Sequence, residues 1–149
     1  MTEDDPRLAM IRGNAALVLA ELGPISGLDD FGYGPESIAW VDGYIERQRQ
    51  RTDDPEAVSS LVSVLGSFLG EAVIKAAGGA WDVHARDEIG VRFENGDWCF
   101  PFSKVAKQFA CGTEDGGESI LSFYNVSVGL IAGDAAREAA AGPSSGERA

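Results

Sequence analysis

The chain has 149 residues, with 12 basic and 24 acidic side chains and a net charge of −12. This length fits one domain with its own hydrophobic core, and the 44% hydrophobic fraction excludes a disordered chain. The negative charge disfavours nucleic acid and anionic membranes as partners, because affinity for phosphate groups depends on lysine and arginine.

Several features predict a cytoplasmic protein without metal or cofactor. Residues 1–5 lack the basic and apolar regions of a secretory signal. The longest nearly uncharged apolar stretch, residues 57–70, is shorter than the roughly 20 residues of a membrane-spanning helix, so we expect no membrane contact. Cys99 and Cys111 lack metal-ligand spacing and are expected to be reduced thiols. The sequence contains no nucleotide-binding loop or paired-histidine motif.

Three helices are predicted in the first half of the chain, and each begins with a proline at its first position: Pro6, Pro35 and Pro55. We expect the first helix to end near residue 22, where a Gly-Pro pair follows. The third, about residues 55–77, is apolar on most of its circumference, which is typical of a central helix.

After residue 78 the apolar period changes from 3.6 to 2, which is typical of strands with one buried face. The residues predicted to face the core are Trp81 and Val83, then Ile89, Val91 and Phe93, then Trp98 and Phe100. The predicted fold class is α+β, with helices packed on one face of a three-stranded antiparallel meander.

Two further helices are predicted after the sheet, over about residues 101–111 and 119–131. Residues 1–140 then form a single α+β domain. Residues 141–149 have nothing to bury and are predicted to form a disordered tail.

The predicted strand register places a row of polar side chains on the outer face of the sheet. A loop over residues 86–88 sets Asp82 beside Arg92, and a two-residue type I′ turn at residues 95–96 sets Arg92 beside Cys99. One interpretation of this row makes Cys99 a nucleophile. Arg92 would then lower the pKa of the Cys99 thiol, and His84, on the same face, would act as its base. His84 and Cys99 are two strand spacings apart, roughly 9.5 Å, which favours instead a solvated face with an Asp82–Arg92 ion pair.

Three more residues complete the set of candidate binding residues. Glu71 interrupts the apolar third helix and would reach a pocket lined by Trp81, although Lys75 four residues on favours an ordinary surface pair. Lys104 and Lys107 form a positive spot on an acidic protein, which suits an anion contact or ion pairs with nearby carboxylates. No catalytic or metal-binding residue is predicted.

The chain also carries a set of short motifs: Leu65-Gly66-Ser67-Phe68-Leu69-Gly70-Glu71, Gly78-Gly79-Ala80-Trp81, Asn95-Gly96, Pro101-Phe102-Ser103-Lys104-Val105-Ala106-Lys107 and residues 119–124. Together they resemble a small bacterial domain family of unknown function over roughly residues 37–126. The resemblance implies a shared fold, since these are core and turn residues with few catalytic types. In size and charge the chain is also similar to the small acidic immunity proteins that neutralise bacterial toxins.

We therefore expect a non-enzymatic, immunity-like binding protein whose acidic surface recognises a basic protein partner. The alternative is a small cysteine-dependent hydrolase or ligand-binding enzyme that uses Cys99, Arg92 and Glu71. A third interpretation is a structural homodimer through the outer sheet face or the edge of the meander.

Overall fold

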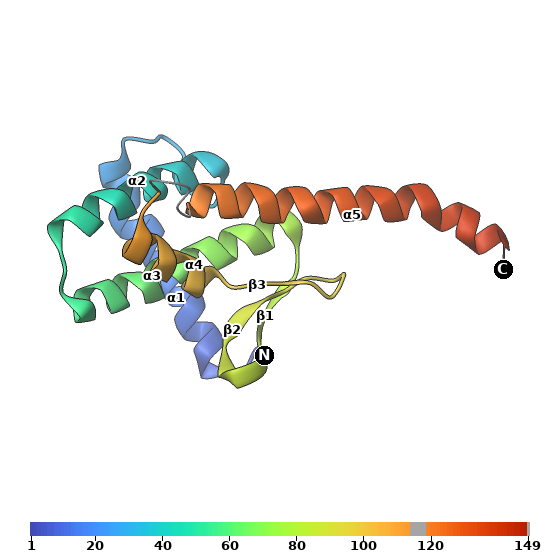
Figure 1. Ribbon diagram of the computed structural model, residues 1–149, viewed down its shortest axis with the longest axis horizontal. Coiled ribbons are helices and arrows are strands. Elements are labelled where there is room, and N and C mark those ends of the chain that lie inside the picture. Colours follow the sequence, from blue (N-terminus) through green and yellow to red (C-terminus); the bar gives the residue numbers. More distant parts are fainter. Residues whose placement is uncertain (114–118, 149) are drawn as a thin grey trace.

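The computed structural model describes residues 1–113 and 119–148, with side chains described as far as residue 140. Within these residues the fold is α+β, with five α-helices and a small three-stranded antiparallel sheet (Figure 1). The helices are α1 (Pro6–Ser26), α2 (Pro35–Arg51), α3 (Pro55–Ala77), α4 (Pro101–Cys111) and α5 (Ile120–Arg148), and the strands are β1 (Ala80–Val83), β2 (Ile89–Arg92) and β3 (Trp98–Cys99). The predicted fold class is confirmed.

The first three helices begin at the predicted prolines. The carboxylate of Asp5 caps α1 by accepting the backbone N–H of Arg7, and that of Asp54 caps α3 by accepting the N–H of Glu56. The same residues are visible in the sequence, so these helix starts were predictable.

The end of α1 differs from the prediction. The helix passes through Pro24 and continues to Ser26. Pro24 lies in the last turn, where its missing N–H removes a single helix hydrogen bond, and the Ser26 hydroxyl donates to the Gly23 carbonyl at 2.7 Å. Gly27, with φ of +76°, then ends the helix in the left-handed conformation.

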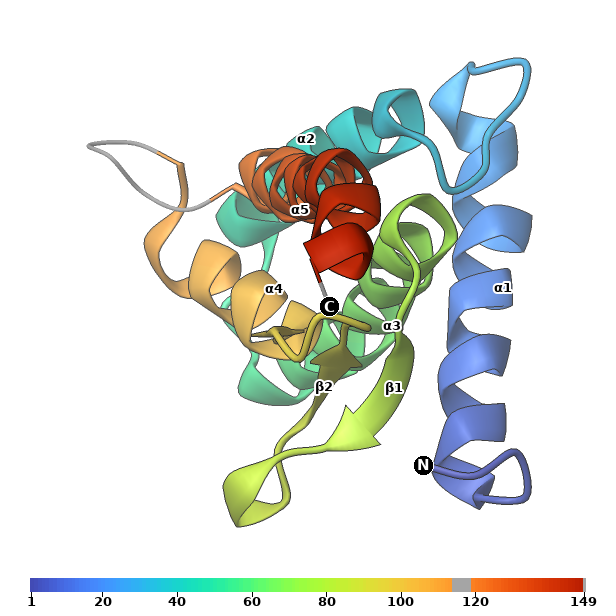
Figure 2. The ribbon, with the colours of Figure 1, turned by 90° about the vertical axis from the view of Figure 1, so that its right-hand side faces the viewer.

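The central helix is α3, as predicted. It packs against α1, α4 and α5, and Figure 2 shows it between α1 on one side and α4 on the other. Two glycines bring aromatic rings against its backbone, because the Trp81 ring lies over Gly70 and the Phe102 ring over Gly66. These two rings also contact each other, with centroids 5.5 Å apart, and so fix β1 and α4 on the same side of α3.

A buried glutamine joins α4 to the helices on either side. The Gln108 side chain is fully buried, and its Nε2 donates to the Asp42 carboxylate at 3.0 Å and to Glu46 at 3.1 Å. Its Oε1 accepts the backbone N–H of Ile120 at 2.9 Å. Both ends of the amide are therefore satisfied, and the network connects α4 to α2 and to the start of α5.

The register between β1 and β2 differs from the predicted one. Val83 lies opposite Ile89 rather than Val91, because the connecting turn, Ala85–Asp87, begins one residue earlier than expected. Each pair therefore moves by two positions along β2. Two is the period of a strand, so every side chain keeps its predicted face, and Trp81 is buried as predicted.

The second hairpin has a three-residue loop instead of the predicted two-residue type I′ turn. The Phe93 N–H donates to the Asp97 carbonyl at 2.8 Å, which leaves residues 94–96 in the loop. Gly96 adopts φ of +94°, and the Asn95 side-chain oxygen accepts the Asp97 N–H at 2.8 Å. This geometry is that of a turn followed by a left-handed glycine, the usual three-residue hairpin loop.

The extra loop residue turns β3 over, because a slip of one residue exchanges the two faces of a strand. Trp98 lies opposite Arg92 on the outer face, and Cys99 lies opposite Val91 on the buried face. The predicted burial of Trp98 beside Phe93 was therefore wrong, and so was the predicted pairing of Arg92 with Cys99.

The last helix is longer than predicted. It starts at Ile120 and runs to Arg148, and its second half extends away from the rest of the protein (Figure 1). Asp42 of α2 caps its start by accepting the Leu121 N–H at 3.1 Å and the Ser119 hydroxyl. The predicted boundary at residue 140 and the predicted disorder of residues 141–149 stay predictions, because side chains after residue 140 lie outside the described part.

Candidate functional site

Cys99 lies in the core, not on the outer face predicted for it. Only 7% of the residue is exposed. Burial raises the pKa of its thiol to about 12, because an apolar environment disfavours the thiolate. The thiol is therefore protonated at neutral pH, which is the opposite of what a cysteine nucleophile needs.

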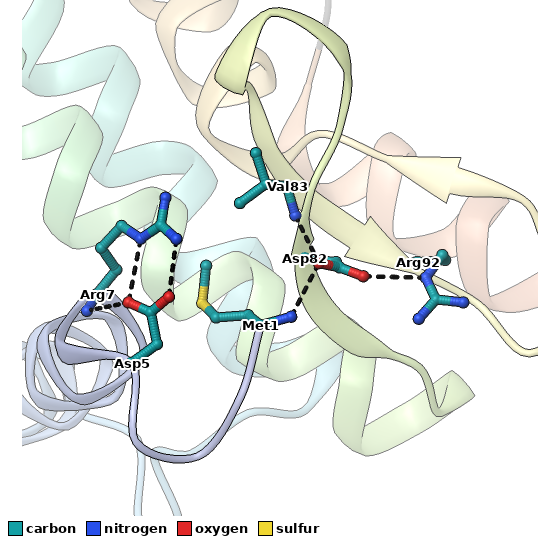
Figure 3. Close-up of polar contacts among 6 residues, drawn as sticks. All are labelled: Met1, Asp5, Arg7, Asp82, Val83 and Arg92. Atoms are coloured by element: carbon teal, nitrogen blue, oxygen red, sulfur yellow. Dashed lines mark hydrogen bonds and ion pairs between the residues drawn. The ribbon is translucent and has the colours of Figure 1, made fainter.

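Asp82 and Arg92 form the ion pair that the sequence predicted, with Arg92 Nε 3.3 Å from Asp82 Oδ2 (Figure 3). Asp82 also accepts the N-terminal ammonium of Met1 at 2.8 Å and the backbone N–H of Val83 at 2.9 Å. The ammonium, then the Val83 N–H, and to a smaller extent Arg92 lower the pKa of Asp82 to about 2. The carboxylate therefore ties the N-terminal segment to β1, which is a structural role.

His84 is exposed and packs edge-on against two rings of β3 and its continuation. Its ring centroid is 4.7 Å from that of Trp98 and 5.3 Å from that of Phe100. Trp98 and Phe100 in turn stack on each other at 6.1 Å. These three rings form an aromatic surface on the outer face of the sheet, where the sequence had predicted a row of polar groups.

Glu71 contacts Trp81, as the sequence suggested, since the indole Nε1–H donates to Glu71 Oε2 at 2.8 Å. The expected surface pair with Lys75 is not seen among the described contacts, because the Lys75 ammonium lies 4.9 Å from the centre of the Tyr33 ring. Glu71, Lys75 and Arg12 line an open hollow of about 580 Å³ between α1 and α3. The hollow is lined by charges of both signs, which gives it no clear preference for one kind of ion.

Three of the predicted residues meet in a second hollow, which we call the β3–α4–α5 cleft. It has a volume of about 510 Å³. Its lining residues are Glu88, Trp98, Cys99, Phe100, Ser103, Lys104, Lys107, Phe123 and Ser127. The Lys104 ammonium lies 5.9 Å from the centre of the Phe123 ring, and burial, followed by the charge of Lys107, lowers its pKa. The cleft therefore combines aromatic walls with two lysines.

This cleft suits binding better than covalent chemistry. The Ser103 hydroxyl donates to Glu88 at 2.9 Å, but no described histidine is in place to accept its proton. The two ammonium groups of the cleft outnumber its one described carboxylate, Glu88, which accepts the Ser103 hydroxyl, so the cleft attracts an anion. Trp98 and Phe123 offer flat apolar surfaces. The sequence predicted Lys104 and Lys107 here but missed the aromatic residues, because the hairpin register assigned Trp98 and Phe100 to the core.

A different kind of site lies where α1 turns into α2. Ile25 is 66% exposed at the end of α1. Asp29 and Asp30 follow in the connecting turn and Glu36 lies in the first turn of α2, and all three are exposed. We call these four residues the α1–α2 corner. The sequence analysis missed it, because the first helix was predicted to end before Ile25.

Of the predicted binding residues, Cys99, Lys104 and Lys107 are brought together in the β3–α4–α5 cleft. Asp82 and Arg92 pair elsewhere on the sheet, and Glu71 lies near α1. No protein-family model, curated protein or solved structure matches the chain.

Proposed function

We propose that the protein is a non-enzymatic, immunity-like binding protein of the cytoplasm that recognises a basic protein partner through its acidic surface. The observation that supports this most is the α1–α2 corner, where exposed Ile25 is followed along the chain by three exposed carboxylates. An apolar anchor within a polar rim is the usual anatomy of a protein–protein interface. The net charge of −12 adds long-range attraction for a basic partner.

The carboxylates of the corner are not neutralised within the described part of the protein. The described ion pairs engage other acids: Glu3, Asp5, Glu46, Asp82 and Asp134. Asp29, Asp30 and Glu36 therefore keep their charge for an external partner.

The cysteine-dependent alternative loses its support from geometry. Cys99 is buried with a raised pKa, Arg92 lies opposite Trp98, and His84 packs against aromatic rings. The three groups that would form a nucleophile, its activating charge and its base therefore do not meet.

The corner is tested by two charge reversals that change the net charge equally. Asp29→Lys lies in the corner, and Asp53→Lys lies in the exposed connection between α2 and α3. The partner is captured on the wild-type protein, purified, and its association rate measured by interferometry at about 50 and about 300 mM NaCl. We expect the wild-type rate to fall about tenfold at the higher salt, and Asp29→Lys to slow association at low salt more than Asp53→Lys. An acidic partner, a rate independent of salt, or equal effects of the two variants would contradict the proposal.

The β3–α4–α5 cleft supports a second function, the binding of a small organic anion with an aromatic group. Lys104 and Lys107 supply positive charge, while Trp98, Phe100 and Phe123 supply flat walls. A cleft of about 510 Å³ has the usual size of a small-molecule site.

Phenyl phosphate is a suitable probe of this cleft, followed by calorimetry and by amide chemical-shift mapping. We expect shifts along β3, α4 and the start of α5, and a loss of about tenfold in affinity for Lys107→Gln, as expected for one charge-assisted contact. Lys75→Gln is the control, because Lys75 lies in a different hollow. Shifts spread over the whole surface, or an equal loss in both variants, would leave only non-specific attraction.

A further inference from the structure

Helix α1 has a second apolar face that the described chain does not cover. One face packs on α3 and is buried. On an adjoining side, Met10 is 62% and Leu17 45% exposed. A helix that is apolar on more than one side is normally buried on more than one side. This exposed face therefore has no neighbour among the described residues.

Two hollows lie along this side of α1, in the seam between α1 and α3. One, of about 240 Å³, is lined by Met10 and Asn14 of α1 together with Ser63 and Ser67 of α3. The other, of about 220 Å³, is lined by Leu17 and residues of α2 and α3. The small serines keep the seam open, and we call it, with its two hollows, the α1–α3 groove.

The residues along the exposed side of α1 have the spacing of a coiled-coil seam. Arg7, Met10, Asn14, Leu17 and Glu21 are separated by three and four residues in alternation. The two ends of the stripe carry opposite charges at equal distances from its centre, because Arg7 and Glu21 lie seven residues on either side of Asn14. Two antiparallel copies related by a two-fold axis at Asn14 therefore place each Arg7 against the Glu21 of the other copy.

The Asn14 side chain has no hydrogen-bond partner among the described residues, and an antiparallel pair of α1 helices would supply one. Its side chain is half-buried beside Met10, and it makes no hydrogen bond within the described residues. A primary amide both donates and accepts, so two Asn14 side chains on a two-fold axis can satisfy each other. Arg7 uses Nε and Nη2 to hold Asp5, at 3.1 and 2.7 Å, and Nη1 takes no part in that pair.

We propose that the protein forms a homodimer through the α1–α3 groove, with the two α1 helices antiparallel about Asn14. Met10 of each copy packs into the hollow beside Leu17 of the other copy. In the same way, Leu17 of each copy packs into the hollow beside Met10 of the other, as in knobs-into-holes packing. The polar Asn14 pair fixes the register, and the two Arg7–Glu21 contacts fix the antiparallel direction. This dimer and the proposed basic partner use different residues, because the dimer contacts run from Arg7 to Glu21, whereas the α1–α2 corner begins at Ile25.

The first test is the mass of the full chain in solution, measured by light scattering and sedimentation equilibrium. We expect twice the mass of one chain for wild type, and a dissociation constant raised by about 100-fold for Leu17→Glu. Leu130→Glu is the control, because Leu130 is an even more exposed leucine on α5, at 62%, and the mass of this variant should equal that of wild type. Leu17 is largely exposed in one chain, so Leu17→Glu should keep the helical circular dichroism spectrum.

The second test addresses the two-fold axis directly. In a Cys111→Ser background, Asn14→Cys should form a disulfide-linked dimer on mild oxidation, whereas exposed Val126→Cys should not. Arg7→Glu should weaken the dimer, and Arg7→Glu combined with Glu21→Arg should restore it. A monomeric wild type, a dimer insensitive to Leu17→Glu, or sedimentation of the wild type with phosphatidylcholine vesicles that depends on Leu17 would overturn the proposal.

Discussion

Cys99 and Cys111 are the two thiols of the chain, and their surroundings differ. Cys99 is buried with a pKa raised to about 12, whereas Cys111 is exposed at the end of α4. The pKa of an ordinary thiol is about 8.5, so the thiolate fraction of Cys99 near neutrality is lower by a factor of about 3000. We therefore predict that iodoacetamide labels Cys111 and leaves Cys99 almost untouched, as measured by peptide mass spectrometry.

The pH dependence of this labelling gives a sharper test. In Cys111→Ser, labelling of Cys99 should stay slow between pH 7 and 9 and become rapid only in about 8 M urea, where the thiol is exposed. The raised pKa also means that the neutral thiol stabilises the fold fully below about pH 8.5, and that this contribution falls as the pH rises towards 12. Rapid labelling of the folded variant near pH 7 would restore the cysteine-dependent enzyme as a hypothesis.

Single residues were predictable where one physical requirement decided their place. Trp81 is buried and Asp82 pairs with Arg92, because the alternation of apolar residues in β1 and β2 leaves only one face for each. The place of Cys99 was not predictable in this way. Cysteine is as readily buried as a larger apolar residue, so the alternation Trp98, Cys99, Phe100 fits either face.

At the scale of the elements, the contact between α3 and β1 depends on a missing side chain. A Cβ added to Gly70 would overlap the Trp81 ring. We predict that Gly70→Ala destabilises the protein by about 1–3 kcal/mol, because the ring must leave its site. Urea unfolding measures this change.

The matched control is Gly129→Ala on α5. Gly129 is exposed, and a Cβ at this position would contact nothing within 4 Å. Alanine is a better helix former than glycine, so this variant should be unchanged or more stable by up to about 1 kcal/mol. An equal loss in both variants would show that Trp81 is not constrained by Gly70.

The hairpin between β2 and β3 shows why Arg92 and Cys99 do not lie side by side as predicted. An Asn-Gly pair fits both a two-residue loop and a three-residue loop with glycine at its last position. In the observed three-residue loop, Asn95 accepts the Asp97 N–H, and Trp98 and Phe100 pack against His84. Those contacts involve a strand and a side chain distant in sequence, so a local pattern does not contain them.

On the scale of the whole molecule, local signals predicted the elements but not their assembly. Proline starts and apolar periodicity predicted the first four helices and the order of strands. The β3–α4–α5 cleft draws residues from three segments, and the α1–α2 corner depends on where α1 ends, so neither followed from spacing alone.

The apolar composition of a helix fits either a membrane-spanning helix or a buried helix of the core. By length and composition, α1 and α3 are each apolar enough to cross a membrane, although residues 57–70 alone were predicted to be too short. Helix α3 lies in the core, where such composition is expected. Among the residues that the structure describes, α1 is buried along the face that packs on α3, and the proposed dimer accounts for the apolar residues on its exposed side.

The projecting part of α5 affects how the protein diffuses and tumbles in solution. Its 29 residues span about 44 Å, roughly three times the radius of gyration, near 15 Å, expected for a compact chain of this length. A particle with such an arm has more friction than a sphere of equal mass and tumbles anisotropically. A single copy would therefore leave a gel-filtration column early, at the volume of a larger globular protein, and its elution position would overstate the number of chains in the particle.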